Sequence, residues 1–307
     1  MRIAAMAAGA VGGYFGARMA AAGHDVFFIA RGANLAAIKN NGLKIESVHG
    51  DLHLPKVNVP DDPKKVGPVD VVLFAVKLWD TEKGAELTRP MVGANTRIIT
   101  VQNGIDAVER IAPILGADKT VGGVAYIATV IEAPGVIKHT SQFATLHFGR
   151  ADKKPDAVLD AFVAAGKKAK CDFDISKDIQ AERWEKFIFL TAMAGTTASR
   201  RSSIGPIVEK PEGLAFFRAL MEEARAVGKA SGTEIGADYI EARMKFLAGT
   251  VNPNMKASMA HDLERGNRLE LDWLNGKVAA LGRKYGIATP ASDEVVAKLE
   301  DFRMGAA

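Results

Sequence analysis

A run of glycines follows the first short apolar segment of the chain, and this feature constrains the fold more than any other. Residues 2–7 have the pattern of a buried strand, Gly9 and Gly12 lie directly after it, and a helical pattern follows. A second apolar and aromatic stretch occupies His24–Ala30. A strand, a glycine turn, a helix and a strand within about thirty residues form one βαβ unit, which belongs to a parallel sheet.

The helix start after this turn is suited to hold a phosphate. Backbone N–H groups in the first turn of a helix have no partner inside the helix and carry partial positive charge. Glycine lets a pyrophosphate approach that backbone closely. We therefore predict a dinucleotide site on Gly9, Ala10, Val11 and Gly12. Ala7 stands where this pattern usually has its first glycine, and we expect it to make the turn with a negative φ.

The end of the second strand indicates which dinucleotide binds. An NAD site usually places Asp or Glu there, to accept a hydrogen bond from the ribose hydroxyl. This chain has Ile29-Ala30-Arg31 and no carboxylate. An arginine binds a 2′-phosphate and stacks on adenine, so NADP(H) is the predicted cofactor. A solvated arginine at a strand end is the alternative for Arg31.

The pattern up to residue 176 predicts a mixed domain. Asp70–Val76 and Thr96–Val101 have the continuous apolar character of strands covered on both faces. Thr120–Gly149 has the alternation of antiparallel strands appended to that parallel sheet. Ala151–Lys168 is expected to be a helix, and Cys171–Ile175 an edge strand.

Beyond residue 176 the strand signals stop, and apolar residues recur every three or four positions. The predicted fold class is α/β, with a Rossmann-type NADP-binding domain and appended antiparallel strands over residues 1–176. An all-helical domain is predicted over residues 177–307. Its helices are expected at Gln180–Ala194, Pro211–Gly228, Asp238–Leu247 and Asn254–Gly282.

The composition of the chain indicates which binding partners and which cellular compartment to expect. The 40 basic and 36 acidic residues leave a net charge of only +4, and the basic residues are spread along the chain. A nucleic-acid surface would be clustered, and no apolar run reaches the roughly 18 residues of a membrane span. The single cysteine, Cys171, permits no intrachain disulfide. We expect a cytoplasmic protein with no nucleic-acid or membrane partner and, because the six histidines form no ligand cluster, no metal.

Several motifs, spread over essentially the whole chain, together resemble one family. They follow the glycine turn and Arg31 in this order: Ala75-Val76-Lys77, Gln102-Asn103-Gly104, Trp184-x-Lys186, Ser258-Met259-x-x-Asp262 and Glu270-Leu-Asp-Trp-Leu-Asn-Gly276. In that order and spacing they resemble the ketopantoate reductases, or 2-dehydropantoate 2-reductases. The resemblance implies an NADPH-dependent reduction of a 2-oxo acid to a 2-hydroxy acid. For true members this is 2-dehydropantoate to pantoate, in pantothenate biosynthesis.

The resemblance also implies roles by position. Lys186 matches the general acid of the family, and Glu270 the acidic partner in the same catalytic site. Ser258 matches a hydroxyl that contacts the substrate. Asn103 matches the residue between nicotinamide and substrate, and Lys77 a lysine on the cofactor side.

The chemistry of the reaction supports the role of Lys186. Hydride addition builds negative charge on the carbonyl oxygen, so an ammonium donor within hydrogen-bond range is what the transition state requires. The residues after Lys186 are Phe-Ile-Phe-Leu, and this apolar flank would desolvate the ammonium. Desolvation lowers the pKa of a lysine toward the range in which it works as an acid.

The spacing of the late motifs leaves two points open. Ser258 and Glu270 are twelve residues apart, which is about 120° around a straight helix. Either the helix bends near Gly266, or the substrate bridges two sides of the site. Asp262 lies one turn after Ser258 and is expected either to contact the substrate or only to orient that serine.

Two positions depart from the family pattern. One and two turns after Lys186, where the family usually has asparagines, this chain has Leu190 and Ala194. A missing amide leaves a buried substrate oxygen unpaired, at about 1–3 kcal/mol. The resemblance makes reduction of 2-dehydropantoate the favoured hypothesis, and the two missing amides make a relative acting on a more apolar 2-oxo acid the second. The third is a non-catalytic NADP-binding sensor. The apolar stripes of the helical domain suggest a homodimer.

Overall fold

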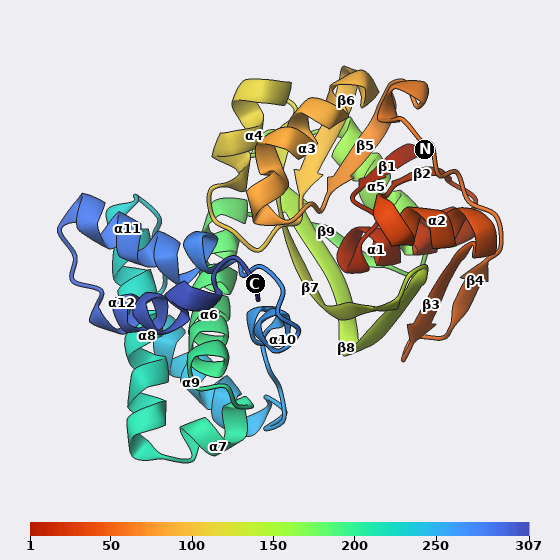
Figure 1. The fold of residues 1–307 in the computed structure, drawn as a ribbon. Coiled ribbons are helices and arrows are strands. Elements are labelled where there is room, and N and C mark those ends of the chain that lie inside the picture. Colours follow the sequence, from red (N-terminus) through yellow and green to blue (C-terminus); the bar gives the residue numbers. More distant parts are fainter. Residues whose placement is uncertain (307) are drawn as a thin grey trace. The chain divides into compact units, whose positions relative to one another are not determined.

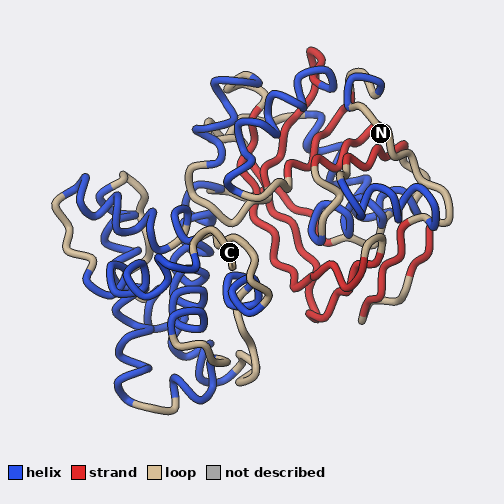
Figure 2. The backbone as a smooth tube through the Cα atoms, in the orientation of Figure 1, coloured by secondary structure: helices blue, strands red, loops and turns tan. Residues whose placement is uncertain are grey.

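The computed structural model describes residues 1–306, and the chain divides into two compact units. The first unit comprises residues 1–102 and 106–179, and the second comprises residues 103–105 and 180–307. Strands gather in the first unit, and the second is built from helices (Figures 1 and 2). The short segment Asn103–Ile105 thus groups with the helical unit, although its neighbours on both sides belong to the first unit.

One nine-stranded sheet forms the centre of the first unit (Figure 1). The strands run in the order β2-β1-β5-β6-β7-β8-β3-β4, and β9 pairs with β8. Those from β2 to β7 in this order are parallel, β7 and β8 form a long antiparallel pair, and β3 and β9 lie parallel to β8. The expected Rossmann-type sheet with appended antiparallel strands is confirmed. The bounds are β1 Arg2–Met6, β2 Asp25–Ile29, β3 Leu43–Ser47, β4 Leu52–Leu54, β5 Val69–Phe74, β6 Val92–Thr100, β7 Thr120–Ala133, β8 Val136–Gly149 and β9 Asp172–Ile175.

Helices cover both faces of the parallel strands, which explains why those strands are apolar throughout. Ile3 and Ala5 of β1 join the core that contains α1 and α5, whereas Ala4 and Met6 join the core that contains α3 and α4. Successive side chains of a strand point to opposite faces, so each short strand serves two cores. The helices of this unit are α1 Ala10–Ala21, α2 Gly32–Asn41, α3 Thr81–Thr88, α4 Ala107–Leu115 and α5 Ala157–Lys168, with 3₁₀ turns η1 Pro63–Lys65, η2 Leu78–Asp80 and η3 Arg89–Met91.

Several element boundaries differ from the sequence expectation. Helix α5 begins at Ala157 rather than Ala151, because the side chain of Asp156 accepts hydrogen bonds from the first N–H groups and caps the helix there. The antiparallel stretch expected over Thr120–Gly149 consists of two long strands, β7 and β8. The short strands β3 and β4 were given no bounds from the sequence.

The helices of the second unit share one apolar core. Trp184, Phe187 and Ile188 of α6 are buried in one core together with Phe217 and other apolar residues of α8. The helical character expected beyond residue 176 is confirmed. The elements are α6 Ile179–Ser199, α7 Ile204–Val208, α8 Pro211–Ala230, α9 Tyr239–Gly249, α10 Ser258–Glu264, η4 Leu271–Trp273, α11 Asn275–Tyr285, α12 Pro290–Leu299 and η5 Glu300–Phe302.

The single helix expected over Asn254–Gly282 is wrong. Helix α10 ends at Glu264, and Gly266 takes a φ of +67°, which continues no right-handed helix. The chain then forms η4, and α11 begins only at Asn275. Ser258 and Glu270 therefore do not share a helix, and the rotation between them cannot be read from their spacing. The break lies next to Gly266, the position at which a bend was one of the two expectations.

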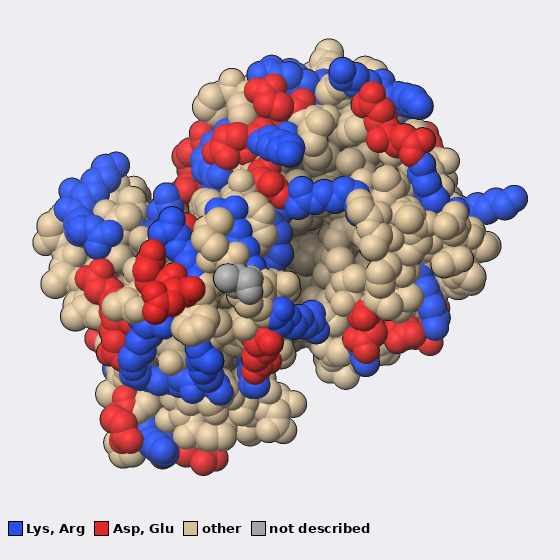
Figure 3. Space-filling model, in the orientation of Figure 1, with Lys and Arg blue, Asp and Glu red and all other residues tan. Residues whose placement is uncertain are grey.

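Surface charge is mixed on the face of the molecule shown in Figure 3, where acidic and basic side chains are interspersed. Among residues 1–306, no helix is both long enough and apolar enough to span a membrane. Within the same residues, no group of three or more His, Cys, Asp or Glu side chains is placed to hold a metal ion. Cys171 is buried, and burial raises the pKa of its thiol to about 12.

Candidate active site

The turn between β1 and α1 is held by hydrogen bonds from neighbouring elements. The backbone N–H of Ala8 donates to the carbonyl of Ile29 at the end of β2, at 2.7 Å. The Asn34 side chain on α2 donates to the carbonyl of Ala8 at 2.9 Å. Its amide oxygen accepts from the N–H of Gly135, at 2.8 Å. The backbone that leads into α1 is thus held in place before any ligand arrives.

The glycines of the turn have different physical roles. A Cβ on Gly12 would lie 2.5 Å from the carbonyl oxygen of Ala7, and one on Gly13 would lie 2.4 Å from the Ile137 side chain. These two glycines let α1 pack closely on the sheet. A Cβ on Gly9 would meet no atom within 4 Å, so the space beside the start of α1 is open. The start of α1 has no side-chain cap and no acidic residue in its first turn, which suits an anionic group.

The expected conformation of Ala7 is wrong. Ala7 has a φ of +62°, in the left-handed region, rather than a negative φ. This conformation costs a non-glycine residue about 1–2 kcal/mol. The close approach of the Ala7 carbonyl to Gly12, together with the hydrogen bonds that hold Ala8, keeps the turn in this shape. Tertiary packing therefore overrides the intrinsic preference of alanine.

Arg31 and Lys77 follow two strands on either side of β1. The strand order reverses at β1, with β2 on one side and β5 on the other, and such a switch point is where nucleotides bind in open α/β sheets. The Arg31 side chain is 77% exposed and donates to the carboxylate of Asp80 at 2.6 Å. Lys77 is exposed, and its Nζ lies 5.5 Å from the centre of the Trp79 ring.

Lys186 and Asn103 lie together in the second unit. The Lys186 ammonium on α6 donates to the Asn103 side-chain oxygen at 2.9 Å. Burial lowers the pKa of Lys186 from its ordinary value of 10.5 to about 8. Desolvation disfavours the charged form of a lysine, and the apolar residues that follow Lys186 on α6 are part of the core. This pair combines a proton donor of nearly neutral pKa with an amide that orients it.

Two side chains hold the segment that carries Asn103. Gln102 donates to the carbonyl of Val76 at 3.0 Å and to the Thr81 hydroxyl at 2.9 Å, which fastens the end of β6 to the segment after β5. Arg183, 6% exposed on α6, donates to the carbonyl of Ile105 at 2.6 Å. Arg183 is not among the site residues predicted from the sequence. Its position three residues before Lys186, on the same side of the helix, was the one available signal.

The remaining predicted site residues lie around the break after α10. Ser258 is exposed at the first position of α10. Asp262, one turn later, accepts a hydrogen bond from the Asn267 side chain at 3.2 Å and thereby fastens the turn at Gly266. Glu270 is 8% exposed and directly precedes η4. The roles predicted for these residues stay predictions.

Leu190 and Ala194 are part of the helical unit's apolar core. Ala194 is 1% exposed, and Leu190 is partly buried against the same core. Neither position offers a hydrogen-bonding side chain to its surroundings. The departure noted in the sequence thus removes two polar groups from one side of α6.

Comparison with known proteins covers both units. The family model described as ketopantoate reductase PanE/ApbA matches residues 3–153, and the model of its C-terminal part matches residues 178–302. A 2-dehydropantoate 2-reductase of Mesorhizobium japonicum is 31% identical, over 97% of this chain and 96% of its own. The structure of a 2-dehydropantoate 2-reductase from Geobacter metallireducens matches with a TM-score of 0.90 and 31% identity, over 98% of this chain and 99% of its own.

A more distant structure shows the breadth of the fold. D-mandelate dehydrogenase, solved with NADH and anilino(oxo)acetate, matches with a TM-score of 0.89 at 20% identity, over 99% of this chain and 100% of its own. At that identity the likeness shows the fold alone. The two family models together span nearly all of the sequence, and the curated relatives are oxidoreductases. The chain belongs to the ketopantoate reductase family of oxidoreductases.

Proposed function

We propose that this protein reduces the carbonyl of a 2-oxo acid to the 2-hydroxy acid with NADPH, and that 2-dehydropantoate, reduced to pantoate in pantothenate biosynthesis, is the favoured substrate. The observation that carries the proposal is the partly buried Lys186 ammonium, with its lowered pKa, held by Asn103. A proton donor of this kind is most efficient when its pKa lies near the working pH.

The residues of the glycine turn fit a dinucleotide. The open space at Gly9 and the uncapped start of α1 accommodate a pyrophosphate, and Gly12 lets the turn close beneath it. We assign Gly9, Ala10, Val11 and Gly12 to the pyrophosphate and Arg31 to the 2′-phosphate. We add Lys77 and Asn103 to the cofactor contacts on the strength of the family resemblance. When bound, the reduced nicotinamide supplies the hydride.

The residues of the second unit supply the acid catalysis. Lys186 is held by Asn103 and donates its proton to the carbonyl oxygen as negative charge develops there. Because the ammonium is desolvated, its attraction for that oxygen is stronger than it would be in water. Glu270 is proposed as the acidic partner in this site, and Ser258 and Asp262 as contacts of the substrate. Proton uptake from solvent then restores the ammonium.

The identity of the 2-oxo acid depends on α6. With Leu190 and Ala194 in place of amides, we expect weak discrimination between 2-dehydropantoate and the same acid without its 4-hydroxyl. A site that hydrogen-bonds a substrate hydroxyl rejects the analogue that lacks it by about 10⁴-fold or more. We predict that the two values of kcat/KM, followed by NADPH absorbance, differ by less than about tenfold.

Three outcomes separate the hypotheses. Turnover of both acids with similar kcat/KM supports the proposed reductase. Turnover only of apolar 2-oxo acids replaces 2-dehydropantoate with the second hypothesis, a relative of different specificity. Tight NADPH binding without turnover of any acid in the panel supports the third, a sensor that has kept the fold.

A second prediction concerns Arg183. We expect Arg183→Met to lower kcat/KM by about tenfold, because a buried carbonyl at Ile105 loses a charged hydrogen bond of about 1.5–3 kcal/mol and the segment bearing Asn103 loosens. The matched control is Arg218→Met, which removes an arginine on α8 that pairs with Glu241. Steady-state kinetics with thermal melting checks both. Unchanged kcat/KM in folded Arg183→Met would show that Asn103 needs no such support.

The remaining assignments complete the proposal. Residues 1–176 are proposed as the NADP-binding domain and residues 177–307 as the substrate and catalytic domain. We propose a homodimer through the helical domain, which sedimentation of the full chain tests. We place the enzyme in the cytoplasm, where a reductase has access to NADPH and 2-oxo acids, and cell fractionation tests that placement.

A further inference from the structure

An ion pair crosses the carboxyl end of β1. Arg31 follows β2, Asp80 lies in η2 after β5, and β1 runs between these two strands. Their side chains meet at 2.6 Å. Since parallel strands end at the same edge of a sheet and lie roughly 5 Å apart, the pair spans the edge at which the Ala7–Gly9 turn begins. The sequence offers no carboxylate at the end of β2, but the fold brings one there from Asp80.

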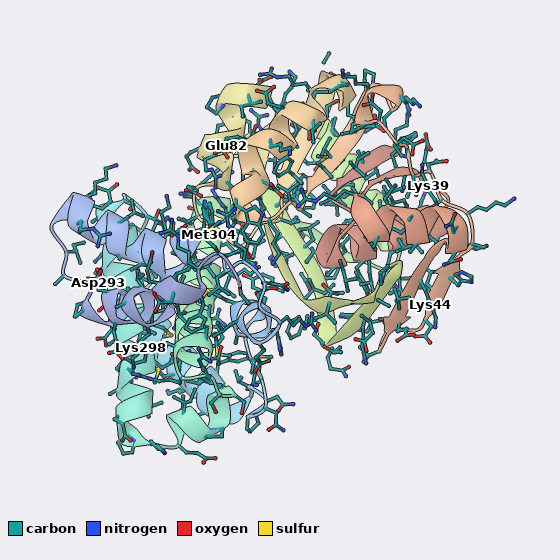
Figure 4. The ribbon with its side chains drawn as sticks, viewed as in Figure 1. Lys39, Lys44, Glu82, Asp293, Lys298 and Met304 are labelled. Atoms are coloured by element: carbon teal, nitrogen blue, oxygen red, sulfur yellow. The ribbon has the colours of Figure 1, made fainter. Side chains whose placement is uncertain are left out.

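Asp80 is the more buried member of this pair, and Arg31 is the more exposed one. The side chain of Asp80 is 22% exposed against 77% for Arg31. The N–H of Asp80 donates to the Lys77 carbonyl at 2.9 Å. Arg110 donates to the Leu78 carbonyl at 2.9 Å and also binds Glu82, labelled in Figure 4. The η2 turn is therefore held to its neighbours on both sides of Asp80.

The Asp80 carboxylate does not cap the helix that follows it. Asp80 occupies the N-cap position of α3, where an aspartate side chain commonly accepts from the backbone of the following turn. It makes no such capping hydrogen bond and is turned toward Arg31 instead. The position of the carboxylate is thus explained by its partner across the sheet edge and not by the helix it precedes.

We infer that Asp80 determines how strongly this site discriminates between NADPH and NADH, an inference that rests on the proposed function. Arg31 attracts a 2′-phosphate, whereas a carboxylate beside it repels the phosphate and offers an acceptor to a ribose hydroxyl. The two groups therefore oppose each other at one position of the nucleotide. The site takes both reduced cofactors, with a preference for NADPH that Asp80 limits.

The test is equilibrium binding of NADPH and NADH to the full chain, followed by nicotinamide fluorescence at low ionic strength. We expect Asp80→Asn, which keeps the shape and removes the charge, to raise the ratio of the NADH Kd to the NADPH Kd by about tenfold. Asp80→Glu keeps the charge and should leave that ratio close to the wild-type value. Added salt should shrink the effect of Asp80→Asn, because screening weakens charge interactions at an exposed site.

The possible results test the role of Asp80 and the proposed function separately. A ratio that stays within about twofold in folded Asp80→Asn, while Arg31→Ala lowers it, overturns the role of Asp80 and leaves the proposed function intact. A ratio that falls in Asp80→Asn also overturns it, because Asp80 would then position Arg31 for the phosphate. If the folded wild-type chain binds neither nucleotide, the proposed function itself fails. Thermal melting of each variant verifies that it is folded.

Discussion

Lys186→Met is expected to lower kcat by about 10²-fold or more, the usual effect of losing a general acid, while making the protein more stable. The methionine keeps the length and apolar stem of the lysine but has no proton to donate. A lysine whose pKa falls from 10.5 to about 8 on folding loses roughly 3 kcal/mol of folding free energy at neutral pH. Replacement of the ammonium by an uncharged side chain should restore part of this folding free energy, about 1–2 kcal/mol.

The pH dependence of both effects follows from the lowered pKa. Lys186 donates a proton, so kcat/KM should be constant at neutral pH and fall as the pH rises through about 8. For stability, the unfolded chain binds more protons than the folded one between pH 8 and 10.5, so the wild type gains stability across that window. The stability advantage of Lys186→Met should shrink over the same range. Kinetic profiles and chemical denaturation at several pH values measure these changes.

Two control variants separate acid catalysis from a general effect of charge. Lys229 is exposed on α8, and Lys229→Met should change neither kcat nor the pH profile. Lys186→Arg keeps a positive charge but holds its proton too tightly to transfer it at neutral pH, so it should remain as inactive as Lys186→Met. A kcat close to wild type in Lys186→Met, or near-full activity in Lys186→Arg, would remove Lys186 as the proton donor.

The fold could be predicted wherever the local sequence pattern of a segment and its packing in the protein favour the same secondary structure. The βαβ unit at the start of the chain, the buried strands after it and the change to helices all follow from apolar runs and glycine turns. The same reasoning failed over residues 254–282, where helical spacing continues across Gly266. Apolar residues in two short helices on one core show the spacing of a single long helix, and only the backbone at Gly266 separates the two cases.

Residues of the candidate site could be predicted from the sequence where they belong to a recognisable sequence motif. Lys186 and Asn103 were found by motif and lie within hydrogen-bond distance of each other. Asp80 and Arg183 were missed because their importance depends on partners far along the chain, Arg31 and Ile105. No local pattern records which strand ends meet at a sheet edge. The positive φ of Ala7 was missed for the same reason, since packing beneath Gly12 decides it.

Two glycines of the turn should differ in how strongly a change to alanine affects stability. Gly9 has a φ of −84° and open space around its Cα, so Gly9→Ala should leave the melting temperature within about 2 °C of wild type. The added methyl group enters the space assigned to the pyrophosphate, and NADPH binding should weaken by about tenfold or more. The structural effect is small and the effect on ligand binding is large.

Gly12→Ala should instead lower the stability of the protein. Its methyl group would lie 2.5 Å from the Ala7 carbonyl oxygen and 3.1 Å from the Ala75 side chain, so the turn or the start of α1 must shift. Forced overpacking of this kind costs about 1–3 kcal/mol, and the melting temperature should fall accordingly. Calorimetry and NADPH titration of the two variants measure both quantities. If Gly9→Ala binds NADPH as tightly as the wild type, the phosphate does not lie at this helix start, because the methyl group leaves it no room there.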